Sequence, residues 1–259
     1  MARYFLEVAY KGTRYSGFQV QQNALTIQSE VEKAFATIQR QPVSLTGSSR
    51  TDAGVHALQN YFHFDFPTEL HPQLVYKMNA LLPPDIVVKS LHSMPPDAHS
   101  RFDATSRAYQ YRVYQTKNPF LKGLGYYYPY KLNFDAMQEG AALVKEQTNF
   151  FAFSKTNTQV KNFNCQILQS AWQQKGEDVY IYNIEGNRFL RGMVRLLTAS
   201  LLKIGRGQLT LKGFESFFTT NTKCGLSVPA DGLFLKKVKF PLDYFPVSQK
   251  DLETFKKNI

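Results

Sequence analysis

The order of predicted secondary structure constrains this chain most, because the order strand-helix-strand-strand-helix-strand occurs twice along it. The first copy has apolar or alternating strands and two amphipathic helices, at 4–10, 26–41, 43–46, 58–66, 72–82 and 86–91. The second copy contains one additional helix and lies at 107–115, 134–147, 165–174, 179–185, 189–204, 211–218 and 232–240. Each copy predicts a ferredoxin-like half, in which helices cover one face of an antiparallel sheet. We therefore expect an α+β protein made of two such halves with antiparallel sheets.

The boundary between the halves is expected near Ala104–Arg107, where an irregular stretch precedes the second copy of the pattern. This gives an N-terminal lobe over 1–105, a C-terminal lobe over 106–245 and a charged, peripheral tail over 246–259. Asn133 is placed to cap the helix at 134–147, and Gly205 to end the helix at 189–204. Along 58–66, even-numbered side chains from Leu58 to Phe66 alternate with a more polar set on the other face.

Charge favours a polyanionic partner. The 259 residues include 31 Lys and Arg against 20 Asp and Glu, a formal net charge of +11. Such an excess favours nucleic acid first and an anionic membrane surface second. The 21 Phe and 15 Tyr supply rings that can stack on bases. The RNP1 pattern of RNA-recognition modules is missing, so base stacking on the sheet is not specifically indicated.

Cysteine usage and hydropathy indicate the compartment. Cys165 and Cys224 lie far apart and have no second Cys or His at ligand spacing, so neither a disulfide framework nor a zinc site is expected. Glu7 stands where a signal peptide needs apolar residues, and no run of ~18 apolar residues predicts a membrane span. These features predict a cytoplasmic protein.

One loop concentrates groups that can carry chemistry. The segment 47–57, GSSRTDAGVHA, joins two predicted core strands and holds Arg50, Asp52 and His56. A cation beside a carboxylate favours its ionised form, which a nucleophile or base requires. The alternative is a structural turn, with Asp52 capping local N–H groups and His56 satisfied by its surroundings. A triad of Ser48, Asp52 and His56 is rejected, because members this close on one loop rarely reach triad geometry.

The octapeptide from Arg50 to Ala57, RTDAGVHA, resembles the signature of the TruA family of tRNA pseudouridine synthases. Further segments resemble family motifs in the same order, at 11–19, 102–111, 189–195 and 229–233, and the resemblance extends from Arg3 to Phe240. Two positions depart from the family pattern. Ser49 stands where Gly usually precedes the signature Arg, and Gly192 stands where a bulkier residue, often His, precedes Met193.

The resemblance implies a pseudouridine synthase fold with a central basic cleft. It also implies that the protein is an isomerase that needs no metal or other cofactor. It implies conversion of uridine to pseudouridine at positions 38, 39 and 40 of the tRNA anticodon stem-loop. The base is cut from C1′ of its ribose, rotated and rejoined through C5. It also implies a homodimer in which one tRNA spans both subunits.

The resemblance also assigns roles to single residues. Asp52 corresponds to the essential carboxylate, which attacks C1′, attacks C6 of uracil or takes the ribose 2′ proton; these three alternatives stay open. Tyr109 corresponds to the ring that stacks on the flipped uracil, and Leu233 to a wall of the pocket. Arg195 corresponds to the basic partner of the aspartate, and Arg50 to a residue that helps displace the target base.

A stacked base must be extruded before it can react, and extrusion costs free energy. Cations that bind the RNA backbone are expected to offset this cost. Arg188, Arg191 and Arg195 are expected to form a basic stripe on one helix face, with a solvated face as the alternative. Phe189, Met193 and Leu197 form the opposing core stripe, and Tyr111 is assigned to packing. The segments that correspond to RNA contacts in the family contain Ala98, His99, Ser100, Arg101, Phe102, Lys155 and Arg191, with Lys161 nearby.

Two other functions compete with this prediction. A non-catalytic RNA-binding module of two ferredoxin-like units explains the charge, the aromatics and the topology. It does not explain why Arg50, Asp52, Tyr109 and Arg195 occur together. A phosphodiester hydrolase would need clustered carboxylates or His to hold metal, which the recognised motifs lack.

Overall fold

The computed structural model describes residues 1–156, 160–220, 222–225 and 227–246. Within these residues the strands are β1 (Ala2–Tyr10), β2 (Thr46–Gly47), β3 (His56–Phe66), β4 (Ile86–Met94), β5 (Ser106–Tyr114), β6 (Tyr126–Tyr127), β7 (Ile167–Lys175), β8 (Val179–Gly186) and β9 (Leu233–Lys239). The helices are α1 (Ile27–Gln39), α2 (Leu74–Leu81), α3 (Phe134–Glu146), α4 (Met193–Gly205) and α5 (Leu211–Thr219). Short 3-10 turns are η1 (Gly12–Arg14), η2 (Pro119–Leu121), η3 (Phe151–Phe153) and η4 (Ala230–Gly232). No helix in these ranges is long and apolar enough to cross a membrane.

All the strands belong to one mixed, mostly antiparallel sheet with the order β4-β1-β3-β9-β5-β8-β7. The antiparallel sheets predicted for the two halves are thus parts of a single sheet, joined through β3 and β9, where His56 pairs with Phe234 and Ala57 with Leu235 in parallel. The short β2 explains this junction. A strand was predicted at 43–46, but β2 has only two residues, Thr46 and Gly47, and pairs only with His63 and Phe62. The opposite end of the same edge of β3 is therefore left free to pair with β9.

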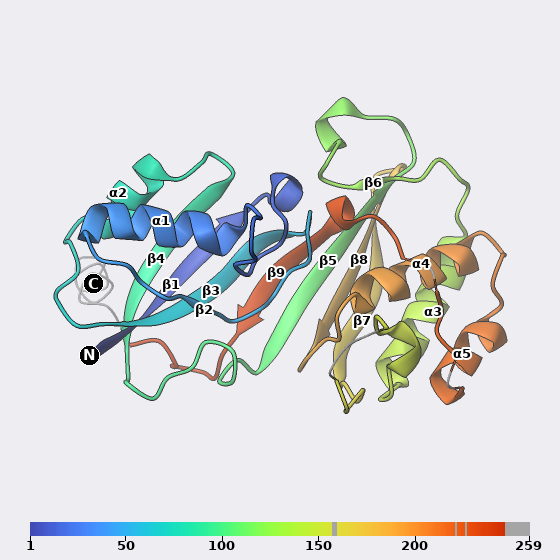
Figure 1. The fold of residues 1–259 in the computed structure, drawn as a ribbon. Helices are drawn as coiled ribbons and strands as arrows, with labels where there is room; N and C mark the ends of the chain where they lie inside the picture. The colour runs from blue at the N-terminus through green and yellow to red at the C-terminus, as the bar shows by residue number, and fades with distance from the viewer. Residues whose placement is uncertain (157–159, 221, 226, 247–259) are drawn as a thin grey trace, which may run out of the picture.

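The two halves of the sheet use the same strand order (Figure 1). In the first half β1 lies between β4 and β3, with β2 outside β3. In the second half β5 lies between β9 and β8, with β7 outside β8. The twofold repeat predicted from the sequence is therefore present in the order of the strands, and the short β6 is an addition that pairs with β5.

Helices cover each half, and each half has its own apolar core. In Figure 1, α1 and α2 lie over the N-terminal strands, while α3, α4 and α5 lie over the C-terminal ones. Thr26 begins α1 with a reciprocal capping box to Ser29, and Asn133 caps α3 as predicted. β9 joins the cores, because Leu235 and Val238 pack in the N-terminal core whereas Leu233 packs in the C-terminal one.

The second face of β3 is also covered, although its sequence is the more polar. Tyr61 and His63 are buried there. The chain after β9 packs against this face, with Phe240, Tyr244 and Phe245 all in ring contact with Phe5 of β1. The alternation along β3 is therefore correct, but aromatic side chains cover both faces. Of the expected tail 246–259, all but Pro246 lies outside the described residues.

Helix α4 begins four residues later than the sequence predicted. Gly192 has a φ of 77° and a ψ of −5°, a left-handed conformation that few residues other than glycine adopt easily. The Met193 N–H donates to the Leu190 carbonyl across this turn at 3.1 Å. Arg188 and Arg191 consequently precede the helix, so the predicted basic stripe along it does not form. Gly205, predicted as the cap, is the last helical residue.

Candidate active site

The loop between β2 and β3 is fixed by the segment that follows β1. The Thr51 hydroxyl shares a hydrogen bond of 2.8 Å with the buried Tyr10 hydroxyl. The Thr51 carbonyl accepts a bond of 3.1 Å from the Phe18 N–H. Gly12 allows the two segments to meet, since a Cβ at that position would lie 2.0 Å from the Val55 carbonyl oxygen. These contacts hold Asp52, the residue after Thr51, in a defined place.

Asp52 faces three cations from distant parts of the chain. Its Oδ1 lies 3.3 Å from Arg191 Nε, and its Oδ2 lies 3.7 Å from Lys155 Nζ and 4.0 Å from an Arg195 guanidinium nitrogen. The Asp52 side chain is 22% exposed, so it remains accessible to a ligand. In the described chain its carboxylate makes no hydrogen bond to a backbone N–H. The alternative in which Asp52 caps local N–H groups is therefore wrong.

The two arginines that face Asp52 differ in how firmly they are held, and Arg50 is not among the cations that face it. Arg195 is 19% exposed, lies on α4 and donates from Nε to the Val228 carbonyl at 2.8 Å. Arg191 is 65% exposed and lies in the turn ahead of α4. Arg50, which the sequence placed beside Asp52, is exposed, and its guanidinium has no ion pair within the described residues. The carboxylate is therefore balanced by residues distant in sequence and not by Arg50.

Tyr109 projects from β5 close enough to Asp52 for the two groups to interact electrostatically. Burial raises the pKa of Tyr109 to about 12, with Asp52 adding to the rise and Arg107 opposing it. The phenol is thus protonated at neutral pH and able to donate a hydrogen bond. Phe189 meets the Tyr109 ring edge-on, with 5.1 Å between centroids. Phe189, Met193 and Leu197 all pack in or against the C-terminal core, as the sequence predicted, and Phe189 also supports the Tyr109 ring.

Leu233 and Tyr111 lie beside Tyr109 on the same face of the sheet. Leu233 is buried at the start of β9 and pairs directly with Tyr111, two residues along β5 from Tyr109. Tyr111 is fully buried and donates from its hydroxyl to the Pro229 carbonyl at 2.8 Å. Its assignment to packing is confirmed.

His56 has a structural position. Its Nδ1 accepts from the Gly12 N–H at 3.0 Å, and its Nε2 lies 3.1 Å from the Asp231 carbonyl, which fits a neutral ring with the proton on Nε2. Burial lowers the pKa of His56, which favours the same neutral form. Both ring nitrogens are thus occupied away from Asp52. This agrees with the rejection of a triad and with the alternative of a satisfied histidine.

Residues 98–102 form a compact loop between β4 and β5. His99 Nδ1 accepts from the backbone N–H groups of Arg101 at 3.1 Å and Phe102 at 3.3 Å. Phe102 is 73% exposed, with its ring 4.1 Å from that of His99 and the Arg101 guanidinium 5.6 Å from its centroid. Ala98 and Ser100 are buried, so only Arg101 and Phe102 present largely exposed side chains.

Arg107 connects this loop to the turn region ahead of α4. Its guanidinium donates to the carbonyls of Arg101, Ala104 and Asn187. Burial lowers the pKa of Arg107. Arg107 lies within the motif at 102–111, although it was not among the predicted site residues.

Acid is expected to destabilise the protein through the histidine below this loop. His63 Nδ1 lies 2.8 Å from Ser100 Oγ, and burial lowers the pKa of His63 from 6.5 to about 4. The unfolded chain therefore binds a proton more readily between these values, so stability falls as pH decreases from 6.5 to about 4. The full effect is at most about 3 kcal/mol.

Urea unfolding at pH 7, 5.5 and 4.5 measures this loss. His63→Gln removes the titrating ring and retains an amide that can hydrogen-bond Ser100, so its stability should depend less on pH across the same range. Equal pH dependence in the two proteins would show that His63 does not cause the loss.

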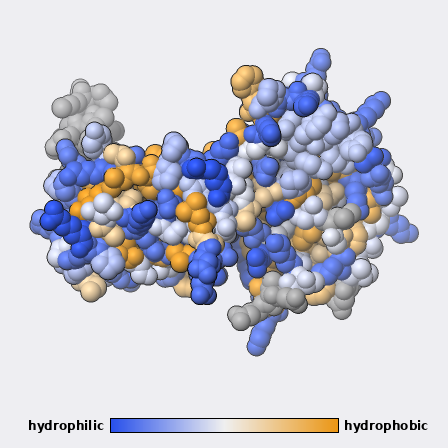
Figure 2. All heavy atoms as spheres, turned by 45° about the horizontal axis from the view of Figure 1, so that its top comes forward, coloured by the Kyte–Doolittle hydropathy of each residue, from blue (hydrophilic) through white to orange (hydrophobic). Residues whose placement is uncertain are grey.

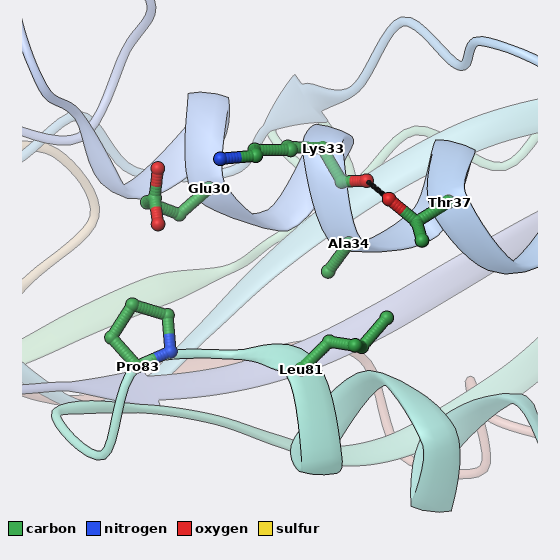
Figure 3. Close-up of a pocket in the computed structure, with 6 residues that line it drawn as sticks. All are labelled: Glu30, Lys33, Ala34, Thr37, Leu81 and Pro83. Atoms are coloured by element: carbon green, nitrogen blue, oxygen red, sulfur yellow. Dashed lines mark hydrogen bonds between the residues drawn. The ribbon is translucent and has the colours of Figure 1, made fainter.

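Two hollows of the described surface can be compared with the position of Asp52. Figure 3 shows a small one of about 130 Å³ between α1 and the end of α2, where Thr37 Oγ1 donates to the Lys33 carbonyl at 2.9 Å. It contains none of the candidate catalytic residues. A larger one of about 260 Å³ is bordered by Gly192 and by Lys155, whose Nζ is paired with Asp52, although Asp52 itself does not line it. Figure 2 shows hydrophilic residues on both sides of the narrow waist between the halves.

Comparison with known proteins assigns the family. A family model described as tRNA pseudouridine synthase matches residues 7–103 and 147–241, which include Asp52 and all three cations around it. The chain is 43% identical over 251 residues to tRNA pseudouridine synthase A of Parabacteroides distasonis, covering 95% of this chain and 99% of that protein. It is 42% identical over 253 residues to the protein of the same name from Porphyromonas gingivalis, covering 95% and 100%. It is 35% identical over 243 residues to that of Staphylococcus aureus, covering 91% and 90%.

The chain therefore belongs to the tRNA pseudouridine synthase family. Within that family it is of the TruA type, an isomerase that acts on uridine in tRNA. The resemblance found in the sequence motifs is confirmed.

Proposed function

We propose that this enzyme converts uridine to pseudouridine at positions 38, 39 and 40 of the tRNA anticodon stem-loop, with Asp52 as nucleophile. The observation that carries the proposal is the accessible Asp52 carboxylate, surrounded by Lys155, Arg191 and Arg195. The carboxylate oxygens are open to a ligand and lie beside positive charge from three separate segments, an arrangement that suits attack on a sugar or base carbon. In the overall reaction the C1′–N1 bond breaks and a C1′–C5 bond forms. The C5 proton is lost and N1 gains one, so no oxidant or co-reactant is consumed.

The target base is proposed to leave the helix and stack on Tyr109. Extrusion costs a few kcal/mol, which stacking and backbone contacts must offset. Tyr109 offers a half-buried ring near Asp52, with Leu233 as a wall on the same face. Arg50, exposed beside the site, is free to enter the space that the base leaves.

The tRNA backbone is proposed to lie in a central basic cleft between the lobes 1–105 and 106–245. The identical strand orders support two ferredoxin-like units. The proposed RNA contacts are Arg191 and the loop of Ala98, His99, Ser100, Arg101 and Phe102, in which Arg101 and Phe102 are exposed. A homodimer sharing one tRNA, located in the cytoplasm, completes the proposal and rests on the family resemblance.

The site of modification is tested with unmodified tRNA, without added metal. Chemical labelling of pseudouridine followed by reverse transcription should give stops at positions 38 to 40 only. Stops elsewhere would contradict the anticodon stem-loop assignment. Light scattering of the protein alone, with a mass near twice 29.7 kDa, tests the dimer.

Substitution of Tyr109 should separate stacking from hydroxyl chemistry. Tyr109→Phe retains the ring and loses a protonated hydroxyl, so we expect a moderate decrease in the single-turnover rate. Tyr109→Ala also loses stacking worth ~1–3 kcal/mol per base, which predicts a further decrease of roughly five- to a hundredfold. Tyr111→Phe, on the same face but bonded to Pro229, controls for loss of a tyrosine hydroxyl. Equal rates for Tyr109→Phe and Tyr109→Ala would contradict a stacking role.

A further inference from the structure

The side chain of Lys155 passes close over Gly192 on its way to Asp52. A Cβ built on Gly192 would lie 3.1 Å from Lys155 Cγ, 3.3 Å from Cε and 3.7 Å from Cδ. Most of the lysine stem therefore lies over the glycine, and its Nζ ends 3.7 Å from Asp52 Oδ2. The sequence had shown Gly192 as a departure from the family pattern, without indicating what the missing side chain permits.

The backbone of Lys155, from which its side chain starts, is also held in place. The Lys155 N–H donates to the Arg191 carbonyl at 3.2 Å, which joins the segment after η3 to the turn ahead of α4. The neighbouring Ser154 Oγ and the Phe151 carbonyl both accept hydrogen bonds of 2.7 Å from Lys223 Nζ. This ammonium lies 3.7 Å from the Phe151 ring centroid. Backbone contacts thus hold the start of Lys155, and the absence of a side chain at Gly192 leaves room for its middle.

The contacts of Asp52 indicate what Lys155 does there. Oδ2 is approached by Lys155 and Arg195, and Oδ1 by Arg191. Arg191 is 65% exposed, whereas the stem of Lys155 lies over Gly192 and its side chain is 42% exposed. Two cations from different elements attract the same oxygen, at 3.7 and 4.0 Å, and together draw the carboxylate toward them more strongly than either alone. A fixed orientation favours attack on a positioned substrate.

We propose that Lys155 is a positioning residue for Asp52 and that the absence of a side chain at Gly192 is what admits it. The proposal rests on the proposed function, in which Asp52 is the nucleophile. It gives Lys155 a different role from the RNA contact that the sequence suggested.

The first test replaces the ammonium by an apolar group of similar length. Lys155→Met should lower the single-turnover rate at saturating tRNA by about two- to fivefold, the upper part of the range for loss of a partly exposed ion pair. The affinity for tRNA and its dependence on salt should change little. If the rate at saturation is unchanged while the log–log salt slope falls by about 0.7–0.9, Lys155 contacts a phosphate and the proposal is wrong.

The second test introduces a side chain at position 192 without a large backbone penalty. Asparagine tolerates left-handed φ values better than most residues, so Gly192→Asn adds mainly the Cβ contact with Lys155. Gly207→Asn is the matched control, because Gly207 has a φ of 70° and nothing lies within 4 Å of a Cβ there. Gly192→Asn should lower the saturating rate, and Gly207→Asn should not.

The double variant decides whether the two residues act together. If Gly192 acts through Lys155, Lys155→Met with Gly192→Asn should be no slower than the slower single variant. Multiplying effects, or an unchanged rate in Gly192→Asn, would overturn the proposal. Thermal unfolding of each variant checks that the fold is intact. Asp52→Asn, measured in parallel, distinguishes failure of the proposed function from failure of the proposal for Lys155. If Asp52→Asn stays active, Asp52 is not the nucleophile, whatever the effect of the Lys155 variants.

Discussion

Asp52→Asn is expected to form no detectable pseudouridine while it folds normally and binds tRNA with nearly unchanged affinity. The amide is close in size to the carboxylate but is a poor nucleophile, and removal of a nucleophile costs at least on the order of a thousandfold in rate. Folding should be preserved because, in the described chain, the Asp52 carboxylate forms ion pairs only with Lys155, Arg191 and Arg195. Partly exposed ion pairs of this kind are worth about 0–1 kcal/mol each.

The measurement combines single-turnover assays, filter binding and urea unfolding on protein free of wild-type enzyme. Asp178→Asn, on the exposed turn between β7 and β8, is the control for loss of one negative charge. Pseudouridine formation at the wild-type rate in Asp52→Asn would remove the basis for the proposed nucleophile.

Arg195→Ala is expected to decrease turnover much more than tRNA binding. Arg195 is largely buried and is anchored to the Val228 carbonyl, so it stays beside Asp52 when RNA arrives. Its loss removes a cation that compensates the carboxylate, which we expect to lower the saturating single-turnover rate about ten- to a hundredfold. Arg195→Lys retains the charge without the guanidinium geometry and should recover part of the rate.

Arg191→Ala is the matched comparison and should behave in the opposite way. Its side chain is the most exposed of the three cations and lies outside α4, so it is able to turn from Asp52 to a tRNA phosphate. Each phosphate contact contributes about 0.7–0.9 to the log–log salt slope, and Arg191→Ala should lose about that much. Arg188→Ala, from the same segment but without an ion pair to Asp52, controls for net charge. If Arg195→Ala reduces only affinity, then Arg195 is a phosphate contact and not the partner of Asp52.

Local patterns predicted most individual elements, because alternation and helical spacing depend on neighbouring residues. The capping Asn133 and the strands β1, β3, β5 and β8 appear close to their predicted positions. The start of α4 was wrong because the left-handed Gly192 breaks a run of residues that otherwise suits a helix. The single sheet was missed because it depends on how much of the β3 edge the two-residue β2 leaves uncovered.

The sequence by itself determined the family, the twofold order of elements and the candidate carboxylate, since the RTDAGVHA motif is contiguous. Only the tertiary structure decided which cations face Asp52. Arg50, two residues away, is exposed, whereas Arg191, 139 residues further along the chain, lies 3.3 Å from the carboxylate. The reason is physical: contacts of Thr51 with Tyr10 and Phe18 orient the loop, and the turn at Gly192 orients its partners. Neither contact is encoded in the spacing of residues along the motif.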